Sequence, residues 1–314
     1  MIYQQLGNTG LIVSRLCMGV LTIGPLQSNL PLSEGADLLV YAMKQGINFF
    51  DTAKIYNNYP YIKMARQKSG MRPVLTSKSY DYTYNGMKDS VEEALDEMGI
   101  NYIDIFMLHE QESELTLKGH RDALHYLAEA REKGIVRAVG MSTHLVRGVM
   151  AGARDPAIEV IHPLINQQGL GIMDGTRDDM LKAIAYARAA GKGIYAMKVL
   201  GGGNLLNQAY NSFAFIRELD TVQSMALGMK NRAEIDLNIA WMEGRRVPHL
   251  ESRVAREPRH LIIEEECLGC GKCTENCRYE ALKVENGRAE VDQSKCILCG
   301  YCSRFCEQFC IKIA

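Results

Sequence analysis

Two cysteine runs near the end of the chain constrain its fold more than any other feature. The first reads CLGCGKCTENC from Cys267 to Cys277, and the second reads CILCGYCSRFC from Cys296 to Cys306. Both have the spacing C-x2-C-x2-C-x3-C, and the segments ALKV and CIKI that follow them also align. Three thiolates at this spacing can bind three corners of one iron–sulfur cubane, while the fourth reaches a second cubane. The repeat therefore predicts a small domain built around two clusters.

The spacing assigns four cysteines to each predicted [4Fe-4S] cluster. One set is Cys267, Cys270, Cys273 and Cys306, and the other is Cys277, Cys296, Cys299 and Cys302. Gly271 and Gly300 stand at the same place in both runs, where the backbone must turn tightly. A zinc ribbon is the alternative, but it needs two cysteine pairs separated by a longer spacer. The other two cysteines, Cys17 and Cys310, are expected to be buried core residues.

Composition limits the class of protein and its partners. A hydrophobic content of 47% and a charged content of 23% are ordinary for a globular protein. The formal net charge of −1 gives no support for nucleic acid or an anionic membrane as a partner. The start shows no export signal, and no apolar run approaches the roughly 20 residues that span a bilayer. We therefore expect a cytoplasmic protein, in which reduced cysteines bind metal rather than form disulfides.

The first 258 residues alternate short apolar runs with helical stretches. Eight runs have the character of strands: SRLCMGV, INFFDTA, PVLTSK, IDIFMLHE, VRAVGMS, VIHPLINQQ, GIYAMKVL and SMALGM. Among the helical stretches, Ser33 is an expected N-cap, and Gly46, Gly134 and Gly191 are expected to end three helices. Eight strand–helix units in about 250 residues predict a (β/α)8 barrel. A doubly wound sheet is the alternative, although its phosphate-binding fingerprint is absent after the first strand.

Polar residues stand at the ends of three consecutive predicted strands. Asp51 ends the second strand and Tyr56 follows shortly after it, Lys78 ends the third strand, and His109 ends the fourth. The carboxyl ends of barrel strands form one rim, where active sites lie. Each residue alone has an ordinary structural explanation, but the set suits protonation of a carbonyl oxygen. Tyr56 would be the general acid, Lys78 would lower its pKa, Asp51 would anchor Lys78, and His109 would orient the carbonyl.

These segments resemble the aldo-keto reductase family. LGNTGLIVSRLCMG is similar to the opening hairpin and first strand, GINFFDTAKIY to the Asp–Tyr segment, LTSK to the Lys strand and IDIFMLHE to the His strand. The resemblance implies a TIM barrel that binds NAD(P)H extended across its top. By position, Ser142, Thr143 and Gln167 match the residues that hold the nicotinamide carboxamide. Met197 stands where the family has a stacking tyrosine.

The resemblance extends to the end of the predicted barrel. GMKNRAEIDLN is similar to the segment that grips the 2′-phosphate and adenine, which implies binding roles for Lys230, Arg232 and Asn238. A solvated basic turn is the alternative. The run Gly201 to Gly203 would allow a phosphate to approach the backbone closely.

The C-terminal segment resembles the bacterial two-cluster ferredoxin domain. It departs from that family after the fourth cysteine of each run, where Arg278 and Glu307 replace the usual proline. We expect a TIM barrel over residues 1–258 and a small α+β ferredoxin-like domain over residues 259–314. The charged stretch from Glu243 to His260 is the expected linker. We also expect the cluster domain to pack near the upper rim of the barrel and help close the site.

Three functions remain open at this level. The first is an NAD(P)H-dependent carbonyl reductase or alcohol dehydrogenase with a small-molecule substrate, whose clusters are structural or dock a ferredoxin-type redox partner. The second is an electron-transfer enzyme in which the clusters deliver single electrons to a substrate or cofactor in the barrel. The third is a non-catalytic redox module on a barrel scaffold, which the four residues at the rim argue against.

Overall fold

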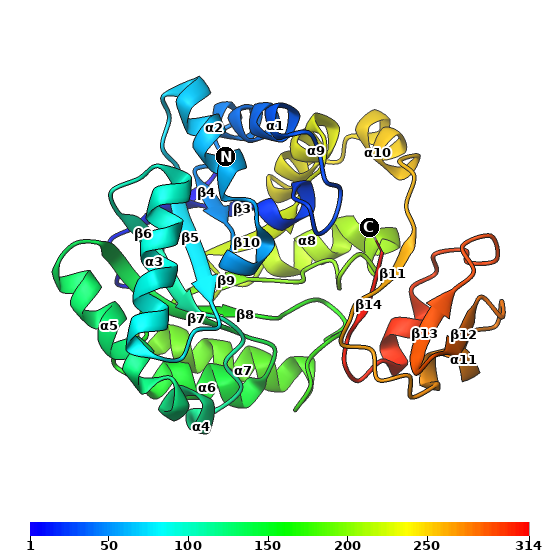
Figure 1. The fold of residues 1–314 in the computed structure, drawn as a ribbon. Helices are drawn as coiled ribbons and strands as arrows, with labels where there is room; N and C mark the ends of the chain where they lie inside the picture. The colour runs from blue at the N-terminus through cyan, green and yellow to red at the C-terminus, as the bar shows by residue number, and fades with distance from the viewer. Residues whose placement is uncertain (314) are drawn as a thin grey trace.

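A closed barrel of eight parallel strands forms the larger part of the molecule (Figure 1). The computed structural model describes residues 1–313, so the last residue of the predicted cluster domain, 314, lies outside them. The barrel strands are β3 (Leu16–Gly19), β4 (Phe49–Asp51), β5 (Val74–Ser79), β6 (Ile103–Leu108), β7 (Val136–Thr143), β8 (Val160–Pro163), β9 (Gly193–Ala196) and β10 (Ser224–Gly228). β10 pairs with β3 and closes the ring. All eight predicted strands and the barrel are confirmed.

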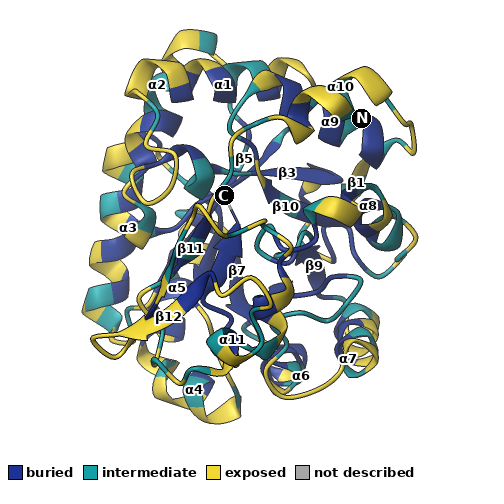
Figure 2. Cartoon of the chain, turned by 90° about the vertical axis from the view of Figure 1, so that its right-hand side faces the viewer, coloured by how far each residue is buried: buried dark blue, intermediate teal, exposed yellow. Residues whose placement is uncertain are grey.

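Helices cover the outside of the barrel, with their buried faces toward the strands (Figure 2). They are α1 (Leu32–Lys44), α2 (Tyr59–Ser69), α3 (Tyr84–Met98), α4 (Glu114–Gly119), α5 (Arg121–Glu132), α6 (Val146–Arg154), α7 (Arg177–Ala189), α8 (Ala209–Arg217) and α9 (Arg232–Met242). Gly46, Gly134 and Gly191 follow the ends of α1, α5 and α7 with positive φ, as expected. No described helix has the length and apolar character needed to cross a membrane.

The expected N-cap of α1, Ser33, was wrong by two residues. The helix begins at Leu32 with Pro31 before it, and the amide of Gly35 donates to the carbonyl of Pro31 at 2.9 Å. Ser33 lies inside the first turn, and its hydroxyl accepts a hydrogen bond from Lys68 at 2.8 Å instead of capping the helix.

An N-terminal hairpin closes the bottom of the barrel. It consists of β1 (Tyr3–Gln5) and β2 (Ile12–Ser14), and the amide of Asn8 in its turn donates to the carbonyl of Gly191 at 3.0 Å. Apolar side chains fill the interior above it: Leu6, Leu11, Val13, Cys17, Phe49, Ile105, Met107, Ala138, Val160 and Tyr195. The expected burial of Cys17 is confirmed. This interior core fixes the strands whose opposite ends carry the polar residues.

The segment between barrel and cluster domain is more regular than expected. Within the expected linker, helix α10 (Pro248–Ala255) forms with proline at its start and Val254 buried. Trp241 of α9 donates from its indole nitrogen to Glu251 at 3.1 Å, which holds α10 against the barrel. Many residues of this stretch are charged, and its apolar residues are too few to show helical periodicity in the sequence.

The cluster domain is built from two small antiparallel pairs. β11 (Leu261–Ile263) pairs with β14 (Ile311–Ile313), and β12 (Leu282–Glu285) pairs with β13 (Arg288–Val291). α11 (Lys272–Glu275) and η4 (Tyr301–Phe305) carry parts of the two cysteine runs. Gly271 and Gly300 have φ of 79° and 70° immediately before these helices, as the tight turns required. These small strands fit the predicted ferredoxin-like fold.

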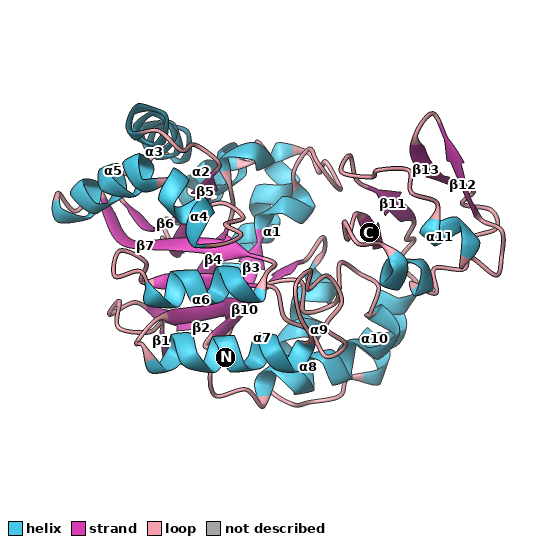
Figure 3. Ribbon diagram, turned by 90° about the horizontal axis from the view of Figure 1, so that it is seen from below, coloured by secondary structure: helices cyan, strands magenta, loops and turns pink. Residues whose placement is uncertain are grey.

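The cluster domain docks on the C-terminal rim of the barrel, as expected (Figure 1, Figure 3). The amide of Ile313 donates to the carbonyl of Gly202 at 2.9 Å, and Asn204 donates from its side chain to the carbonyl of Ile311 at 2.9 Å. A Cβ atom on Gly203 would lie 1.9 Å from the carbonyl oxygen of Ile313. The glycine run therefore admits β14 in this structure, where the sequence had suggested a phosphate.

Candidate active site

Lys78 and Asp51 form a buried ion pair at the carboxyl ends of β5 and β4. The Lys78 ammonium donates to the two Asp51 oxygens at 2.7 and 2.8 Å and to the carbonyl of Thr52 at 2.7 Å. Only 2% of Lys78 and 6% of Asp51 are exposed. The hydroxyl of Tyr195 on β9 donates to Asp51 Oδ1 at 2.8 Å. The pair is thus fully hydrogen-bonded, which a buried ion pair requires to be tolerated.

Tyr56 and His109 lie beside this pair, so the structure brings the four predicted residues together. Tyr56 ends the short helix η2 (Lys54–Tyr56) that follows β4, and His109 directly follows β6. Their ring centroids are 5.9 Å apart in an edge-to-face arrangement. The Lys78 ammonium lies 5.4 Å from the centroid of the Tyr56 ring. A phenol, an imidazole and a paired ammonium therefore meet at one barrel mouth.

The expected effect on the Tyr56 phenol was wrong. Burial, and then the negative charges of Asp51 and Glu110, hold the pKa of Tyr56 well above its ordinary value. Lys78 does not reverse this rise, because Asp51 pairs with its ammonium at 2.7 Å. The phenol is therefore protonated at neutral pH and has a proton to give.

His109 is held in its neutral form. Burial, followed by the positive charge of Lys78, lowers the pKa of His109 well below its ordinary value. The Tyr80 ring stacks on the imidazole with centroids 4.3 Å apart, and the buried Nδ1 has no hydrogen-bond partner among the described residues. A neutral imidazole with a free nitrogen can hydrogen-bond a ligand without contributing charge.

The residues expected to hold a carboxamide differ in whether their side chains already have hydrogen-bond partners. Ser142 accepts a hydrogen bond from the amide of Glu110 at 2.8 Å. Thr143 is fully buried, and its hydroxyl accepts from the amide of Leu145 at 3.1 Å. Gln167 alone keeps a buried amide oxygen without a partner. Met197 is half-buried at the end of β9.

The residues expected at the nucleotide end lie around the start of α9. The side chain of Lys230 donates to the carbonyl of Pro258 in the linker at 3.4 Å. The exposed guanidinium of Arg232 lies 5.0 Å from the Tyr41 ring centroid, and Asn238 is buried on α9. The carboxylate of Glu234 accepts from the amide of Lys230 at 2.8 Å. One lysine is therefore engaged by the linker, and an acidic group stands beside it.

The docked domain bears on how NAD(P)H could bind. β9 lies between β8 and β10 in the barrel, so a molecule reaching from Gln167 to Lys230 must cross the loop after β9. β14 is hydrogen-bonded to that loop at Gly202. β14 therefore borders the path that an extended dinucleotide would take between these residues.

Several residues at the mouth were missed by sequence reasoning. Tyr195 looks like an ordinary strand aromatic, and only strand alternation could have placed it inside the barrel. Lys198, Glu264 and Lys312 come from the loop after β9 and from the cluster domain, so only the docked arrangement brings them together. The charge of Glu264 is near enough to contribute to the raised pKa of Tyr56.

Three cysteines of the first run and Cys306 surround one cavity. Cys267, Cys270, Cys273 and Cys306 all line it. The Cys267 sulfur accepts a hydrogen bond from the amide of Ala289 at 3.3 Å. Burial, and then the neighbouring thiolates of Cys306 and Cys267, raise the pKa of Cys273. This arrangement fits a cubane bound by the predicted set.

The second set of cysteines is grouped in the same way. Burial, followed by the charges of Cys299, Cys273 and Cys296, raises the pKa of Cys302 to about 12, and Cys277 contributes as well. Among residues 1–313, no group of three or more His, Cys, Asp or Glu side chains is arranged to hold a single metal ion. A cubane differs from such a site because each thiolate binds a separate iron.

Cys310 is buried as expected, and it has a further contact. Its sulfur lies 3.3 Å from that of Cys306. This contact is the main cause that lowers the pKa of Cys306 to about 6. Cys310 therefore packs directly against a predicted cluster ligand.

The barrel and its mouth define a class: a (β/α)8 enzyme with a phenol, an imidazole and a paired ammonium at one rim. Residues 15–246 match the aldo/keto reductase family, and residues 259–307 match a 4Fe-4S dicluster domain. The chain belongs to the aldo/keto reductase family and is an oxidoreductase.

Known relatives are distant. L-Galactose dehydrogenase of Arabidopsis thaliana is 24% identical over 226 residues, covering 65% of this chain and 67% of that protein. Methylglyoxal reductase DkgA of Escherichia coli O157:H7 is 23% identical over 168 residues, covering 51% of this chain and 60% of that protein.

Solved structures share the fold. An aldo-keto reductase of Pseudomonas aeruginosa superposes with a TM-score of 0.66 at 24% identity, covering 77% of this chain and 94% of that chain. A holo aldo-keto reductase of Bacillus halodurans gives a TM-score of 0.66 at 16% identity, covering 82% and 96%.

Proposed function

We propose that the protein interconverts a small-molecule carbonyl and its alcohol at the barrel mouth, with Tyr56 exchanging the proton. The observation that supports this most is the hydrogen-bonded Lys78–Asp51 pair beside Tyr56 and His109. These groups come from three consecutive strands and face one point. The iron–sulfur clusters would be bound by the two predicted cysteine sets. We place the protein in the cytoplasm.

Tyr56 gives its proton to the substrate oxygen as that oxygen gains electrons. An alkoxide is a stronger base than a phenolate, so transfer is favourable even from a phenol with a raised pKa. Lys78 then lies 5.4 Å from the ring and stabilises the phenolate. His109, being neutral, hydrogen-bonds the carbonyl and fixes its direction.

Two sources of electrons are candidates. NAD(P)H is typical of the family, and a bound nicotinamide would supply a hydride. The second candidate is delivery of two electrons, one at a time, through the cluster domain from a ferredoxin-type partner. The carbonyl carbon would then take a second proton from water, besides the one that Tyr56 gives to the oxygen. This second candidate is favoured by the docking of β14 on the loop after β9.

Anaerobically purified holoprotein tests the proposal. Methylglyoxal and other carbonyls would be supplied with NADPH, NADH or a reduced ferredoxin. L-Galactose and other alcohols would be supplied with NADP+, NAD+ or an oxidised ferredoxin, and products would be identified by mass spectrometry. Turnover with NADPH that survives Cys270→Ser supports the nicotinamide, since Cys270 is a predicted cluster ligand. Turnover that needs ferredoxin and is lost in Cys270→Ser supports the second candidate. No product from a panel of small aldehydes, ketones and alcohols under any of these conditions contradicts the proposal.

A further inference from the structure

Two lysines from different domains converge on one phenylalanine at the barrel mouth. Lys312 of β14 places its ammonium 3.6 Å from the Phe309 ring centroid, and Lys198 of the loop after β9 places its own at 5.7 Å from the same centroid. Phe309 is buried against Gly171, where an added Cβ would lie 2.6 Å from the ring. The barrel surface is therefore shaped to receive this ring and, with it, Lys312.

The two lysines differ in whether a nearby carboxylate balances their charge. Glu264 lies 3.5 Å from Lys312 and is its one ion-pair partner among residues 1–313. Lys198 takes part in no ion pair within the same residues. Glu110, the other carboxylate of this rim, lies 3.7 Å from His144 and accepts the Tyr80 hydroxyl at 2.7 Å. Asp51 is already bonded to Lys78. Lys198 thus remains an uncompensated cation.

The backbone holds Lys198 in place at some cost. Its φ is +57°, a left-handed conformation that is strained for a residue other than glycine. Its carbonyl accepts the amide of Gly201 at 2.7 Å and the side chain of Asn166 at 3.3 Å. The charge of Lys198 also lowers the pKa of His109, His144 and Lys312. The backbone of this strained residue is therefore held at the carboxyl end of β9.

Three buried polar atoms on the loops that follow the barrel strands lack hydrogen-bond partners among the described residues. They are His109 Nδ1, His144 Nε2 and Gln167 Oε1. His109 is 6% exposed, so its free nitrogen is costly unless a ligand bonds it. Because both imidazoles are neutral, the lysines supply the positive charge of the site.

We propose that Lys198 and Lys312 bind the carboxylate of the substrate, so that the preferred substrate is a small oxo acid or hydroxy acid. The barrel supplies one ammonium and the cluster domain supplies the other. The carboxylate is held at this pair while the adjoining carbonyl faces Tyr56 and His109. This inference rests on the proposed function, which it narrows to a substrate class.

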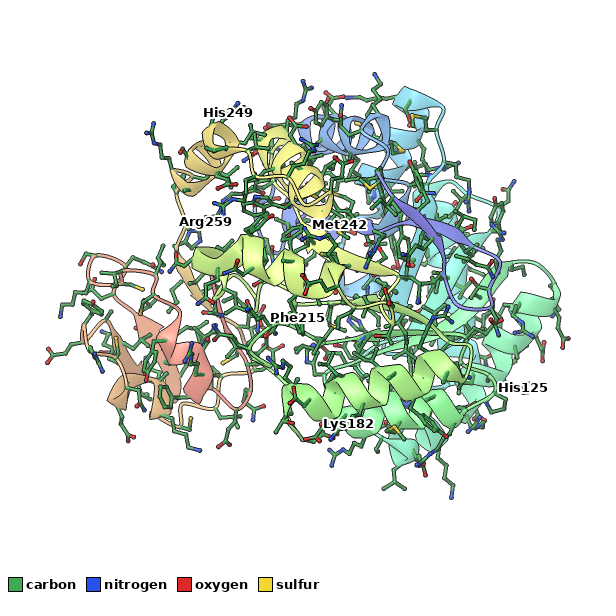
Figure 4. All side chains as sticks on the ribbon, turned by 180° about the vertical axis from the view of Figure 1, so that it is seen from behind. His125, Lys182, Phe215, Met242, His249 and Arg259 are labelled. Carbon is green, nitrogen blue, oxygen red and sulfur yellow. The ribbon has the colours of Figure 1, made fainter. Side chains whose placement is uncertain are left out.

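The test compares glyoxylate with the neutral aldehyde acetaldehyde in holoprotein, using whichever electron donor supports turnover. Lys198→Gln should raise KM for glyoxylate about tenfold or more and leave KM for acetaldehyde and kcat nearly unchanged, because a charge-assisted hydrogen bond is lost. Lys198→Arg should keep most of the affinity. Lys182→Gln is the matched control, since Lys182 is 81% exposed in its side chain on α7 (Figure 4). Equal effects on both aldehydes, or none, would overturn the proposal.

A second measurement does not depend on turnover. Oxalate, a dicarboxylate without a reducible carbonyl, should bind wild type in calorimetry and bind Lys198→Gln about tenfold more weakly. If no carbonyl is reduced but oxalate binding shows this loss, the proposed function fails and the carboxylate site stands. If Lys198→Gln weakens NADPH binding and leaves oxalate binding unchanged, the lysines serve a phosphate and the carboxylate assignment is wrong.

Discussion

At the scale of single residues, Tyr195 supports the ion pair from inside the barrel. Its hydroxyl bonds Asp51 at 2.8 Å, and its ring stacks on His162 with centroids 3.8 Å apart. Tyr195→Phe removes one donor from a buried carboxylate. We expect kcat to fall severalfold with KM unchanged, because the anchor of Lys78 loosens while the mouth keeps its shape. Steady-state kinetics check this, and Tyr210→Phe, which loses a hydrogen bond at an exposed position, is the control. Equal kinetics in both variants would contradict a positioning role.

His162 gives a pH dependence of stability. Burial lowers the pKa of His162 to about 4, below its ordinary value of 6.5. Between these values the unfolded chain binds a proton that the folded chain does not, so stability is full above 6.5 and falls as pH approaches 4. His162 should account for about 2 kcal/mol of the loss at pH 5, and His109 and His144, whose pKa values burial also lowers, add to it. Urea unfolding at pH 7 and pH 5 measures it.

Two variants test whether His162 contributes to this pH dependence of stability. His162→Gln should show a smaller difference between the two pH values. His125→Gln, at an exposed histidine of α5 (Figure 4), should keep the wild-type difference. A difference of wild-type size in His162→Gln would show that His162 is not its source.

Site residues could be predicted from the sequence where both their side-chain chemistry and their position at a strand end pointed to an active site. Asp51, Tyr56, Lys78 and His109 were located correctly because each lies at or just after a strand end. The direction of the Tyr56 pKa was not predictable, since it depends on burial and on how tightly Asp51 compensates Lys78.

At the scale of elements, β14 and the loop after β9 form the joint between the domains. Gly203→Val would place a side chain on the Ile313 carbonyl and should undock β14. Gly134→Val is the control, because Gly134 also has positive φ but nothing lies within 4 Å of its Cβ position. Hydrogen exchange should rise over residues 309–313 in the first variant alone. Protection that stays equal in both variants would contradict the docking.

Element boundaries were predictable where glycine or strand character marked them. The barrel strands were found because eight apolar runs recur with helices between them. α10 was missed because only the contact of its Glu251 with Trp241 of α9 reveals an ordered side. The sequence also could not show that the glycine run after β9 contacts β14, because β14 is more than 100 residues away in sequence.

At the scale of the whole molecule, the cluster domain completes the barrel mouth rather than standing apart from it. Glu264, Phe309 and Lys312 reach the site from that domain. A sequence predicts such a domain from its cysteines and can suggest that it covers the rim. It cannot give the pairing of side chains across the joint, since that depends on the docked orientation.

The central claim is that Tyr56 gives the substrate its proton, and one comparison tests it most directly. Turnover of a small carbonyl by anaerobic holoprotein would be measured for wild type, Tyr56→Phe and Tyr82→Phe, with cluster absorbance recorded for each. Tyr82 is an exposed phenol away from the ion pair. We predict that Tyr56→Phe lowers kcat at least about a hundredfold with unchanged cluster absorbance, while Tyr82→Phe behaves as wild type. Full activity in Tyr56→Phe would contradict the account.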